Sequence, residues 1–476
     1  MSLKTSRRRL IKAGGLAATG LALSGWPLLK KARAAERPNF LFILTDDQRH
    51  DALSAAGHPF LRTPNIDWLA KTGARFTNAF VTTSLCSPSR ASFLTGQYAH
   101  RHGVLNNLTP WNEQNTTFLE LMKKSGYYTG FIGKWHMPGK GLPDLAGQGK
   151  VDEFISFTAV AGQGVYWNCP LVRNGRSMKK DGYISEVLNG LAIDFLRQAR
   201  GRNFCLCLSH KAAHAPFQAP EAYRGIYDQE DLRLPPEYLA HGLNFKFCAP
   251  HSSSGILRRG TMEDEYRRYC ETLKALDDSL ARVFEELAKL KLLEQTVIIF
   301  AGDNGYLWGE HKLVDKRFAY EESIRIPLLV RAPGIVSSPG QNIDRMVLNI
   351  DLAPTLLELA GLPVPGEMQG ASFRPLLEGK NVPWRKSFLY EYPYDPPYAL
   401  PGLLAVRTET MKLVKYEKNK LPDELYDIEN DPRELSSLSS NPAHADRKRQ
   451  LQTELERLAL EAGLPRNSAL GRILED

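Results

Sequence analysis

The chain has 476 residues, of which 43% are hydrophobic and 24% are charged. These values are typical of globular proteins and exclude a disordered, collagen-like or low-complexity chain, while the length allows about three domains or one large domain with a smaller one. The net charge of +8 comes from residues 1–34, which contain eight basic residues and no acidic one. The rest has 53 basic and 53 acidic residues, so charge gives no reason to expect a nucleic acid as partner.

The first 34 residues have the pattern of an export signal. Ser6-Arg7-Arg8-Arg9-Leu10-Ile11-Lys12 is a twin-arginine pattern, and a weakly apolar run from Ala13 to Leu29 leads to Ala32-Arg33-Ala34, a small-x-small cleavage site. The run is short and rich in glycine for a membrane anchor, so we favour a leader. It resembles twin-arginine leaders, which implies that the twin-arginine export machinery delivers the folded protein to the periplasm or the outside of a bacterium.

The six cysteines show no zinc-ligand spacing. They are Cys86, Cys169, Cys205, Cys207, Cys248 and Cys270. Export permits disulfides, but their pairing cannot be read from the spacing.

Four apolar runs, each followed by polar residues, predict the main sheet. They are Asn39 to Thr45, Tyr128 to Ile132, Phe204 to Leu208 and Thr296 to Ala301. Helical patterns alternate with them at Thr117 to Lys124, Gly182 to Gln198 and Glu263 to Leu293. This alternation predicts an α/β fold, in which helices flank a large doubly wound sheet that is mixed or mostly parallel. A functional site is expected where the strands end.

From about Arg385 the pattern changes to short alternating runs. These are Ser387 to Tyr392, Leu403 to Arg407, Met411 to Tyr416 and Glu424 to Asp427, and a charged helix is expected from Pro442 to Ala462. We therefore predict a leader over residues 1–34, a catalytic α/β domain over 38–384 and a smaller C-terminal α+β subdomain with an antiparallel sheet over 385–476.

The segment from Cys86 to Gly96 is the most informative motif. Taken alone, Cys86 could be a thiol activated at a helix N-terminus or a buried structural cysteine. The segment resembles the signature C-x-P-S-R-x-x-x-L-T-G of the sulfatase family, which belongs to the alkaline-phosphatase-like superfamily. The matching residues are Cys86, Pro88, Ser89, Arg90, Leu94, Thr95 and Gly96.

The resemblance implies that a formylglycine-generating or maturase enzyme oxidises Cys86 to formylglycine. The aldehyde of formylglycine hydrates to a geminal diol, in which one hydroxyl attacks sulfur and the second expels sulfate afterwards. A serine alcohol could perform only the first half without a water. Arg90, one helical turn on, is expected to face the diol and the sulfate oxygens.

Two polar pairs at strand ends predict a metal site. Asp46 and Asp47 follow the first run, and Asp303 and Asn304 follow the fourth. Each pair alone is more typical of a turn or cap, but three carboxylates and an amide converge only around a cation, and oxygen ligands favour Ca²⁺ or Mg²⁺. The resemblance assigns these four residues and the formylglycine from Cys86 as ligands of one ion, usually calcium.

Two histidine segments follow the other two runs. Gly133-Lys134-Trp135-His136 matches the family element G-K-W-H, and the segment from His210 to Phe217 resembles one that ends in H-x-P. A histidine in such a place is often structural. The resemblance implies that Lys134 holds the diol and sulfate, that His136 takes the proton of the second hydroxyl, and that His214 is the general acid for the leaving oxygen. His210 is expected to be structural.

The segment from Glu310 to Arg317 resembles the family segment G-E-H…D-K-R. The resemblance implies that Lys316 binds sulfate near the leaving oxygen. His311 could assist Lys316 or serve as a cap or surface residue. We expect Lys312 and Arg317 to be solvated charges.

These resemblances imply a sulfuric ester hydrolase. We favour a sulfated carbohydrate, such as a glycosaminoglycan or other polysaccharide fragment, because export suits large external substrates and the segment from Gly305 to Pro333 looks most like glycan sulfatases. An arylsulfatase of broad specificity acting on aryl sulfates, a phosphonate or phosphodiester hydrolase, and a non-catalytic glycan-binding protein are the alternatives. Loop packing is the more common role of aromatic and basic residues, but six of them are candidates to line a sugar pocket: Tyr166, Trp167, Arg173, Tyr392, Tyr394 and Tyr398.

Overall fold

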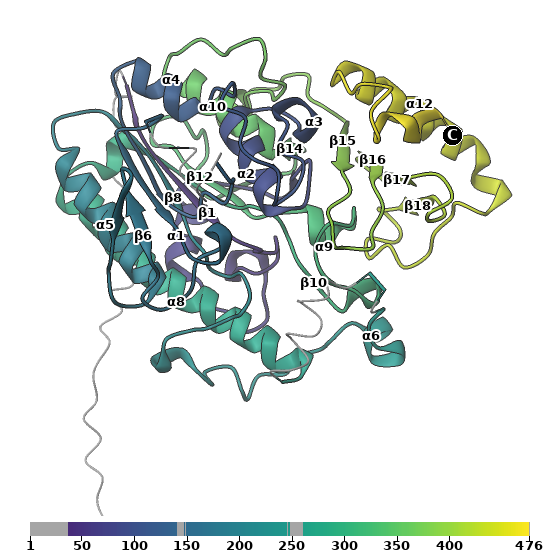
Figure 1. Ribbon diagram of the computed structural model, residues 1–476, viewed down its shortest axis with the longest axis horizontal. Coiled ribbons are helices and arrows are strands. Elements are labelled where there is room, and N and C mark those ends of the chain that lie inside the picture. The colour runs from purple at the N-terminus through teal and green to yellow at the C-terminus, as the bar shows by residue number, and fades with distance from the viewer. Residues whose placement is uncertain (1–36, 140–146, 148, 245, 248–259, 476) are drawn as a thin grey trace, which may run out of the picture. The chain divides into compact units, whose positions relative to one another are not determined.

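Figure 1 shows the computed structural model, which describes residues 37–139, 147, 149–244, 246–247 and 260–475. These residues belong to one compact unit. The leader expected over residues 1–34 and Cys248 lie outside the described residues. Among the helices that are described, none is both long and apolar enough to cross a bilayer.

A ten-stranded sheet forms the centre of the fold. Its five middle strands run parallel in the spatial order β9 (Thr296–Gly302), β1 (Asn39–Thr45), β8 (Phe204–Ser209), β4 (Tyr128–Gly133) and β5 (Glu153–Phe157). All residues of β1, β8 and β9 are buried, which explains why these strands are continuous apolar runs. Beyond β9 lie β12 (Leu328–Arg331), β2 (Ala74–Phe76) and β13 (Gln341–Ile343), and beyond β5 lie β6 (Leu171–Arg173) and β7 (Arg176–Met178).

Helices cover both faces of this sheet, as expected for a doubly wound fold (Figure 1). One face carries α1 (Pro64–Thr72), α5 (Ile184–Gln198) and α8 (Met262–Lys289), and the other carries α2 (Cys86–Thr95), α4 (Phe118–Lys124) and α10 (Leu352–Leu359). A capping box between Thr261 and Asp264 fixes the start of α8. Shorter helices are α3 (Ala99–His102), α6 (Pro236–His241), α9 (Glu321–Ile324) and α11 (Arg374–Leu377), and two-stranded ribbons pair β10 (Leu307–Trp308) with β11 (Val314–Asp315) and β14 (Val347–Leu348) with β3 (Ala79–Phe80).

The predicted C-terminal sheet is present and antiparallel. Its strands are β15 (Ser387–Tyr392), β16 (Leu403–Thr408), β17 (Met411–Tyr416) and β18 (Glu424–Asp427), and α12 (Ala445–Glu461) contacts the first three of them. The predicted fold class is therefore confirmed. The boundary near residue 384 stays a prediction.

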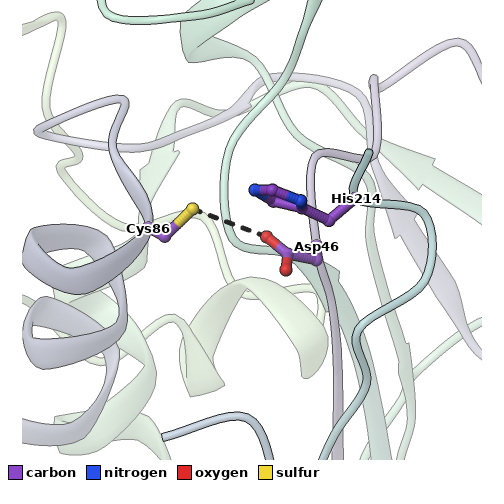
Figure 2. A group of neighbouring side chains, drawn as sticks. All are labelled: Asp46, Cys86 and His214. Carbon is purple, nitrogen blue, oxygen red and sulfur yellow. Dashed lines mark hydrogen bonds between the residues drawn. The ribbon is translucent and has the colours of Figure 1, made fainter. Parts of the chain in front are cut away.

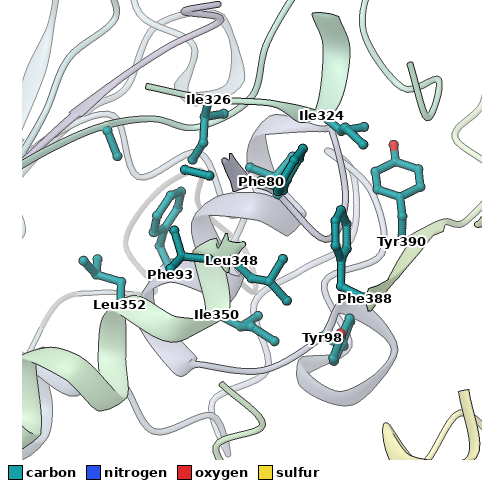
Figure 3. Close-up of a cluster of buried hydrophobic side chains, with 14 of the residues drawn as sticks. Phe80, Phe93, Tyr98, Ile324, Ile326, Leu348, Ile350, Leu352, Phe388 and Tyr390 are labelled. Atoms are coloured by element: carbon teal, nitrogen blue, oxygen red, sulfur yellow. The ribbon is translucent and has the colours of Figure 1, made fainter. Parts of the chain in front are cut away.

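One apolar core connects the two sheets. In the cluster shown in Figure 3, the ring of Phe80 lies 4.9 Å from that of Phe388 on β15, and Phe93 on α2 packs 5.5 Å from Phe42 on β1. The C-terminal sheet also contacts the segment that leads into α2, because the amide of Ser84 donates to the hydroxyl of Tyr390 on β15 (3.2 Å).

Candidate active site

The carboxyl ends of four parallel strands are joined by backbone hydrogen bonds. The amide of Asp303, after β9, donates to the carbonyl of Thr45 at the end of β1 (2.9 Å). The amide of Lys134, after β4, donates to the carbonyl of Ser209 at the end of β8 (2.8 Å). The polar residues that follow these strands are thereby held at one edge of the sheet.

Cys86 is the first residue of α2 and points to the same edge. Its Sγ lies 3.5 Å from Asp46 Oδ1 (Figure 2) and 3.2 Å from Lys316 Nζ. Burial raises the pKa of the Cys86 thiol to about 12, although the thiol is at a helix N-terminus. Burial therefore disfavours the thiolate form of unmodified Cys86.

Three buried carboxylates meet beside Cys86. Asp46, Asp47 and Asp303 each offer an oxygen, and these oxygens lie within 4.8 Å of one another. The side-chain amide of Asn304 donates to Asp47 Oδ1 (2.7 Å), while its own carbonyl oxygen is buried without a hydrogen-bond partner. Burial and the charge of Asp46 raise the pKa of Asp303 to about 7. A group of oxygens that repel one another, with an unpartnered carbonyl beside them, fits a hard divalent cation.

Three basic side chains surround these carboxylates. Both Nε and Nη2 of Arg90 contact Asp303 Oδ2 at 2.9 and 2.8 Å, and Lys134 Nζ contacts Asp46 Oδ2 at 2.5 Å. Lys316 Nζ donates to Asp47 Oδ1. Burial alone would raise the pKa of Asp46, but the ammonium of Lys134 helps to hold it well below its usual value. Arg90 thus pairs with Asp303, because a buried guanidinium pairs with an available carboxylate, and its expected role toward the diol and the sulfate stays a prediction.

The two expected catalytic histidines have different hydrogen-bond partners. Nδ1 of His136 is 3.2 Å from the hydroxyl of Ser87, next to Cys86. Nδ1 of His214 is 2.6 Å from the carbonyl of Ala215, so this nitrogen is the donor and Nε2 is left to face Asp47 Oδ2 at 3.8 Å. Burial, reinforced by nearby positive charge from Lys134, lowers the pKa of both imidazoles well below 6.5.

Arg317 differs from the expectation of a solvated charge. It is buried, its Nη1 contacts Asp315 (2.6 Å), its Nε contacts Asp395 (3.2 Å), and its guanidinium lies 3.4 Å from the ring centroid of Tyr398. The expectation was wrong because two carboxylates and an aromatic ring, two of them distant in the sequence, compensate for its desolvation.

The side chain of His311 lies against Tyr320 and Glu322. Its ring stacks on Tyr320, with centroids 3.6 Å apart, and its Nε2 lies 3.8 Å from Glu322 Oε2. His210 is buried, and neither of its ring nitrogens has a hydrogen-bond partner among the described residues, so its structural role stays a prediction.

The sequence analysis assigned no role to Lys211, and it named Tyr166, which lies beside His214, only as a candidate to line a sugar pocket. Lys211 is buried in the loop after β8, and the hydroxyl of Tyr166 donates to the carbonyl of His214 (2.7 Å). Lys211 belongs to the motif that contains His214, so its position was visible. The burial of Lys211 could not be predicted from the motif, because it depends on the segment around Tyr166.

Two family models match the chain. The sulfatase model matches residues 38–362, and a model described as N-sulphoglucosamine sulphohydrolase, C-terminal, matches residues 309–461. An N-acetylglucosamine-6-O-sulfatase of Bacteroides thetaiotaomicron is 28% identical over 93% of this chain and 89% of its own length. The human N-acetylglucosamine-6-sulfatase is 32% identical over 76% of this chain and 68% of its own.

Two solved structures are also similar to this chain. A structure of a protein in complex with its substrate D-glucosamine-2-N,6-O-disulfate has a TM-score of 0.81 at 27% identity, covering 90% of this chain and 98% of the other. A phosphonate monoester hydrolase of Agrobacterium radiobacter has a TM-score of 0.73 at 23% identity, covering 90% of this chain and 96% of the other. The second likeness shows the fold alone.

Proposed function

Because this chain belongs to the sulfatase family, we propose that it removes the 6-sulfate from N-acetylglucosamine or a related glucosamine in a glycosaminoglycan-type carbohydrate. As a sulfatase it is a sulfuric ester hydrolase. The proposal rests on one observation above all: Cys86, three carboxylates and three basic side chains meet at one sheet edge. Relatives named for N-acetylglucosamine-6-sulfate support the choice of substrate.

The proposal includes two groups that the chain must acquire. Cys86 is oxidised to formylglycine, and calcium, with magnesium as the less favoured ion, is held by residue 86 and by Asp46, Asp47, Asp303 and Asn304. When bound, the cation offsets the charge of the sulfate and acidifies the hydroxyl of residue 86. The all-oxygen ligand set and the unpartnered carbonyl of Asn304 support this assignment.

The basic side chains bind the sulfate ester. Lys316 Nζ already lies 3.2 Å from Cys86 Sγ, so it borders the space next to the nucleophile. Lys134 and Arg90 balance the negative charge of Asp46 and Asp303 and orient these carboxylates. A sulfate that enters here meets the ammonium of Lys316 next to residue 86.

His214 and His136 move protons at different atoms: His214 serves the leaving oxygen of the substrate, and His136 serves residue 86. Nδ1 of His214 is fixed on the carbonyl of Ala215, so Nε2 is the atom that delivers a proton to the leaving oxygen. Burial lowers the pKa of His214, and the negative charge of the sulfate raises it again when substrate binds. His136, beside Ser87 and Cys86, takes the proton from residue 86 when sulfate is released.

Export is part of the proposal. The twin-arginine pattern of residues 6–12 supports delivery of the folded protein to the periplasm or the exterior. Such a route would allow residue 86 to be oxidised and the metal to be inserted before export. Replacing Arg7 and Arg8 by lysine should retain the protein in the cytoplasm, and unchanged periplasmic activity would contradict this route.

Two measurements on the purified protein test the function. Mass spectrometry of the tryptic peptide that contains residue 86 should show formylglycine in place of cysteine. Turnover of N-acetylglucosamine-6-sulfate should exceed that of nitrophenyl sulfate and of a phosphodiester. Unmodified Cys86 in an active preparation, or a preference for the phosphodiester, would contradict the proposal.

A further inference from the structure

Lys211 has a buried ammonium group that forms no ion pair with any described residue. It lies three residues before His214 and is 2% exposed, and the part of the chain that the structure describes gives its Nζ no hydrogen bond and no ion pair. The ring of Tyr166 lies near this ammonium, with its centroid 5.1 Å from Nζ. Burying an unpaired ammonium costs several kcal/mol, so proteins rarely keep one without a use.

The surroundings place Lys211 next to the reaction. The amide of His214 donates to the carbonyl of Lys211 (2.8 Å), and the hydroxyl of Tyr166 donates to the carbonyl of His214 (2.7 Å). Tyr166 is held from behind by Tyr183, with stacked rings 5.7 Å apart. Lys211 is therefore fixed to the same short loop as the imidazole that faces Asp47.

No carboxylate of the described residues forms an ion pair with Lys211, although Asp46 and Asp47 act on its charge from farther away. Lys134 is taken by Asp46, and Lys316 is taken by Asp47. Burial and the positive charge of Lys134 lower the pKa of Lys211 to about 8, so at neutral pH its amine is still mostly protonated. The ring of Tyr166 stabilises this charge through a cation–π contact and leaves the three N–H donors free.

We propose that Lys211 binds a second anionic group of the substrate, a sulfate or carboxylate that is not the one removed. This inference rests on the proposed function and extends it, because it makes the preferred substrate a sugar sulfate with at least two negative charges. If His214 serves the leaving oxygen, the sugar ring must lie against the loop of residues 210–214. A second oxyanion on that ring or on its neighbour would then supply the partner that Lys211 lacks.

Replacing Lys211 by methionine tests the inference, because methionine keeps much of the length and loses the charge. Three substrates are compared: N-acetylglucosamine-6-sulfate, glucosamine-2-N,6-O-disulfate, and a disaccharide in which a uronate adjoins N-acetylglucosamine-6-sulfate. In Lys211→Met the KM of at least one doubly charged substrate should rise about 10- to 100-fold with kcat nearly unchanged, as for loss of one charge-assisted hydrogen bond. The singly charged substrate should change by less than about threefold. Whichever doubly charged substrate is affected identifies the sugar that carries the second anion.

Lys246→Met is the matched control. Lys246 lies at the same 5.1 Å from an aromatic centroid, that of Phe247, but its side chain is exposed and is not part of the candidate site. Its loss should change no KM. Thermal unfolding provides a second readout: Lys211→Met should be at least as stable as the wild type, since it removes an unpaired buried charge.

Three results would overturn the inference. An equal loss on all three substrates would mean that Lys211 serves the departing sulfate or His214. Unchanged KM values throughout would mean that it binds no substrate group, and a clear fall in the unfolding temperature would mean that its charge is structural. If the wild type turns over none of the three substrates, the proposed function itself fails. If the wild type is active and Lys211→Met leaves its substrate preference unchanged, only the inference about Lys211 fails.

Discussion

Two buried lysines, one in the C-terminal sheet and one at the catalytic edge, are surrounded in opposite ways. Nζ of Lys412, on β17, contacts Glu321 (2.9 Å), Glu434 (2.7 Å) and the carbonyl of Ala319 (2.6 Å). Lys211, equally buried, has no polar partner among the described residues. The three partners of Lys412 come from the chain itself, so its charge is used within the fold.

The difference separates charges that hold the fold together from charges that await a ligand. At the C-terminal sheet, Glu321 is bound by Lys412 and also by Arg407, and these pairs join α9 to β16 and β17. At the catalytic edge, the side-chain carbonyl of Asn304 is buried without a hydrogen-bond partner among the described residues. Lys211, which is 2% exposed, makes no ion pair with any of them. Buried polar groups are costly unless satisfied, so those left open mark the places where a substrate or an ion completes the structure.

The largest effect is expected from removing the nucleophile. Cys86→Ala should fold normally and lose sulfatase turnover by several orders of magnitude, because nothing else in the site can be converted to the attacking group. Cys86→Ser should be nearly as inactive unless the host has a maturase that accepts serine. Cys205→Ala, another buried cysteine but on β8 away from the cluster, is the control and should keep its activity. Near-full activity of Cys86→Ala would refute the assignment.

The next largest effect concerns the metal. Asp303→Ala should lose the bound calcium or magnesium and, with it, on the order of 10³-fold in turnover, because an oxygen-only site loses a charged ligand. Elemental analysis of the purified proteins measures this directly. Asp395→Asn changes a buried carboxylate outside the cluster and should retain the ion. A metal content unchanged in Asp303→Ala would remove Asp303 from the ligand set.

Stability should distinguish the two lysines. Lys412→Met leaves the carboxylates of Glu321 and Glu434 without their shared cation, and should lower the free energy of unfolding by about 3–5 kcal/mol. Lys211→Met should not lower it. Chemical denaturation of both variants and of the wild type measures these free energies of unfolding. Equal stability of the two variants would contradict the predicted difference between the two lysines.

A smaller effect is expected from the general acid, and it depends on the substrate. His214→Ala should lose about 10²-fold more activity on a sugar sulfate than on nitrophenyl sulfate, since nitrophenolate leaves without a proton and a sugar alkoxide does not. His136→Ala should reduce turnover of both substrates alike. Equal losses for His214→Ala on the two esters would mean that His214 binds sulfate, and Lys316 would then be the candidate acid.

The smallest effect is a pH dependence at the contact between the two sheets. His100, on α3, faces two acceptors, Glu391 Oε2 (2.7 Å) and the carbonyl of Ala462 (2.9 Å). Burial alone would lower the pKa of His100, but Glu391 raises it above 6.5. The stabilising contribution is therefore complete below pH 6.5 and is lost as pH rises through the raised pKa.

His100→Gln should remove this dependence, because glutamine can still donate to Glu391 but does not titrate. The measurement is the free energy of unfolding of both proteins on either side of pH 6.5. A wild-type protein whose advantage over His100→Gln grows with rising pH would show that the sign is wrong.

The sequence alone predicted four central strands of the ten-stranded sheet and the polar residues that follow them. Long apolar runs such as Asn39–Thr45 can form only buried strands, and parallel strands bring the residues after their carboxyl ends together. That rule placed Asp46, Asp303 and Lys134 near one another. The signature at Cys86 supplied the expected chemistry, while the roles of the individual side chains stay predictions.

Only the tertiary structure decided which charges are satisfied. Whether Lys211, Lys412 or Arg317 has a partner depends on residues far along the chain, such as Tyr166 for Lys211, Glu321 for Lys412 and Asp395 for Arg317. The local sequence around a lysine does not reveal whether its side chain is exposed, paired with a carboxylate, or buried without a partner. Burial and pairing arise from packing between distant segments, and it is their free-energy cost that separates a structural charge from one kept for a ligand.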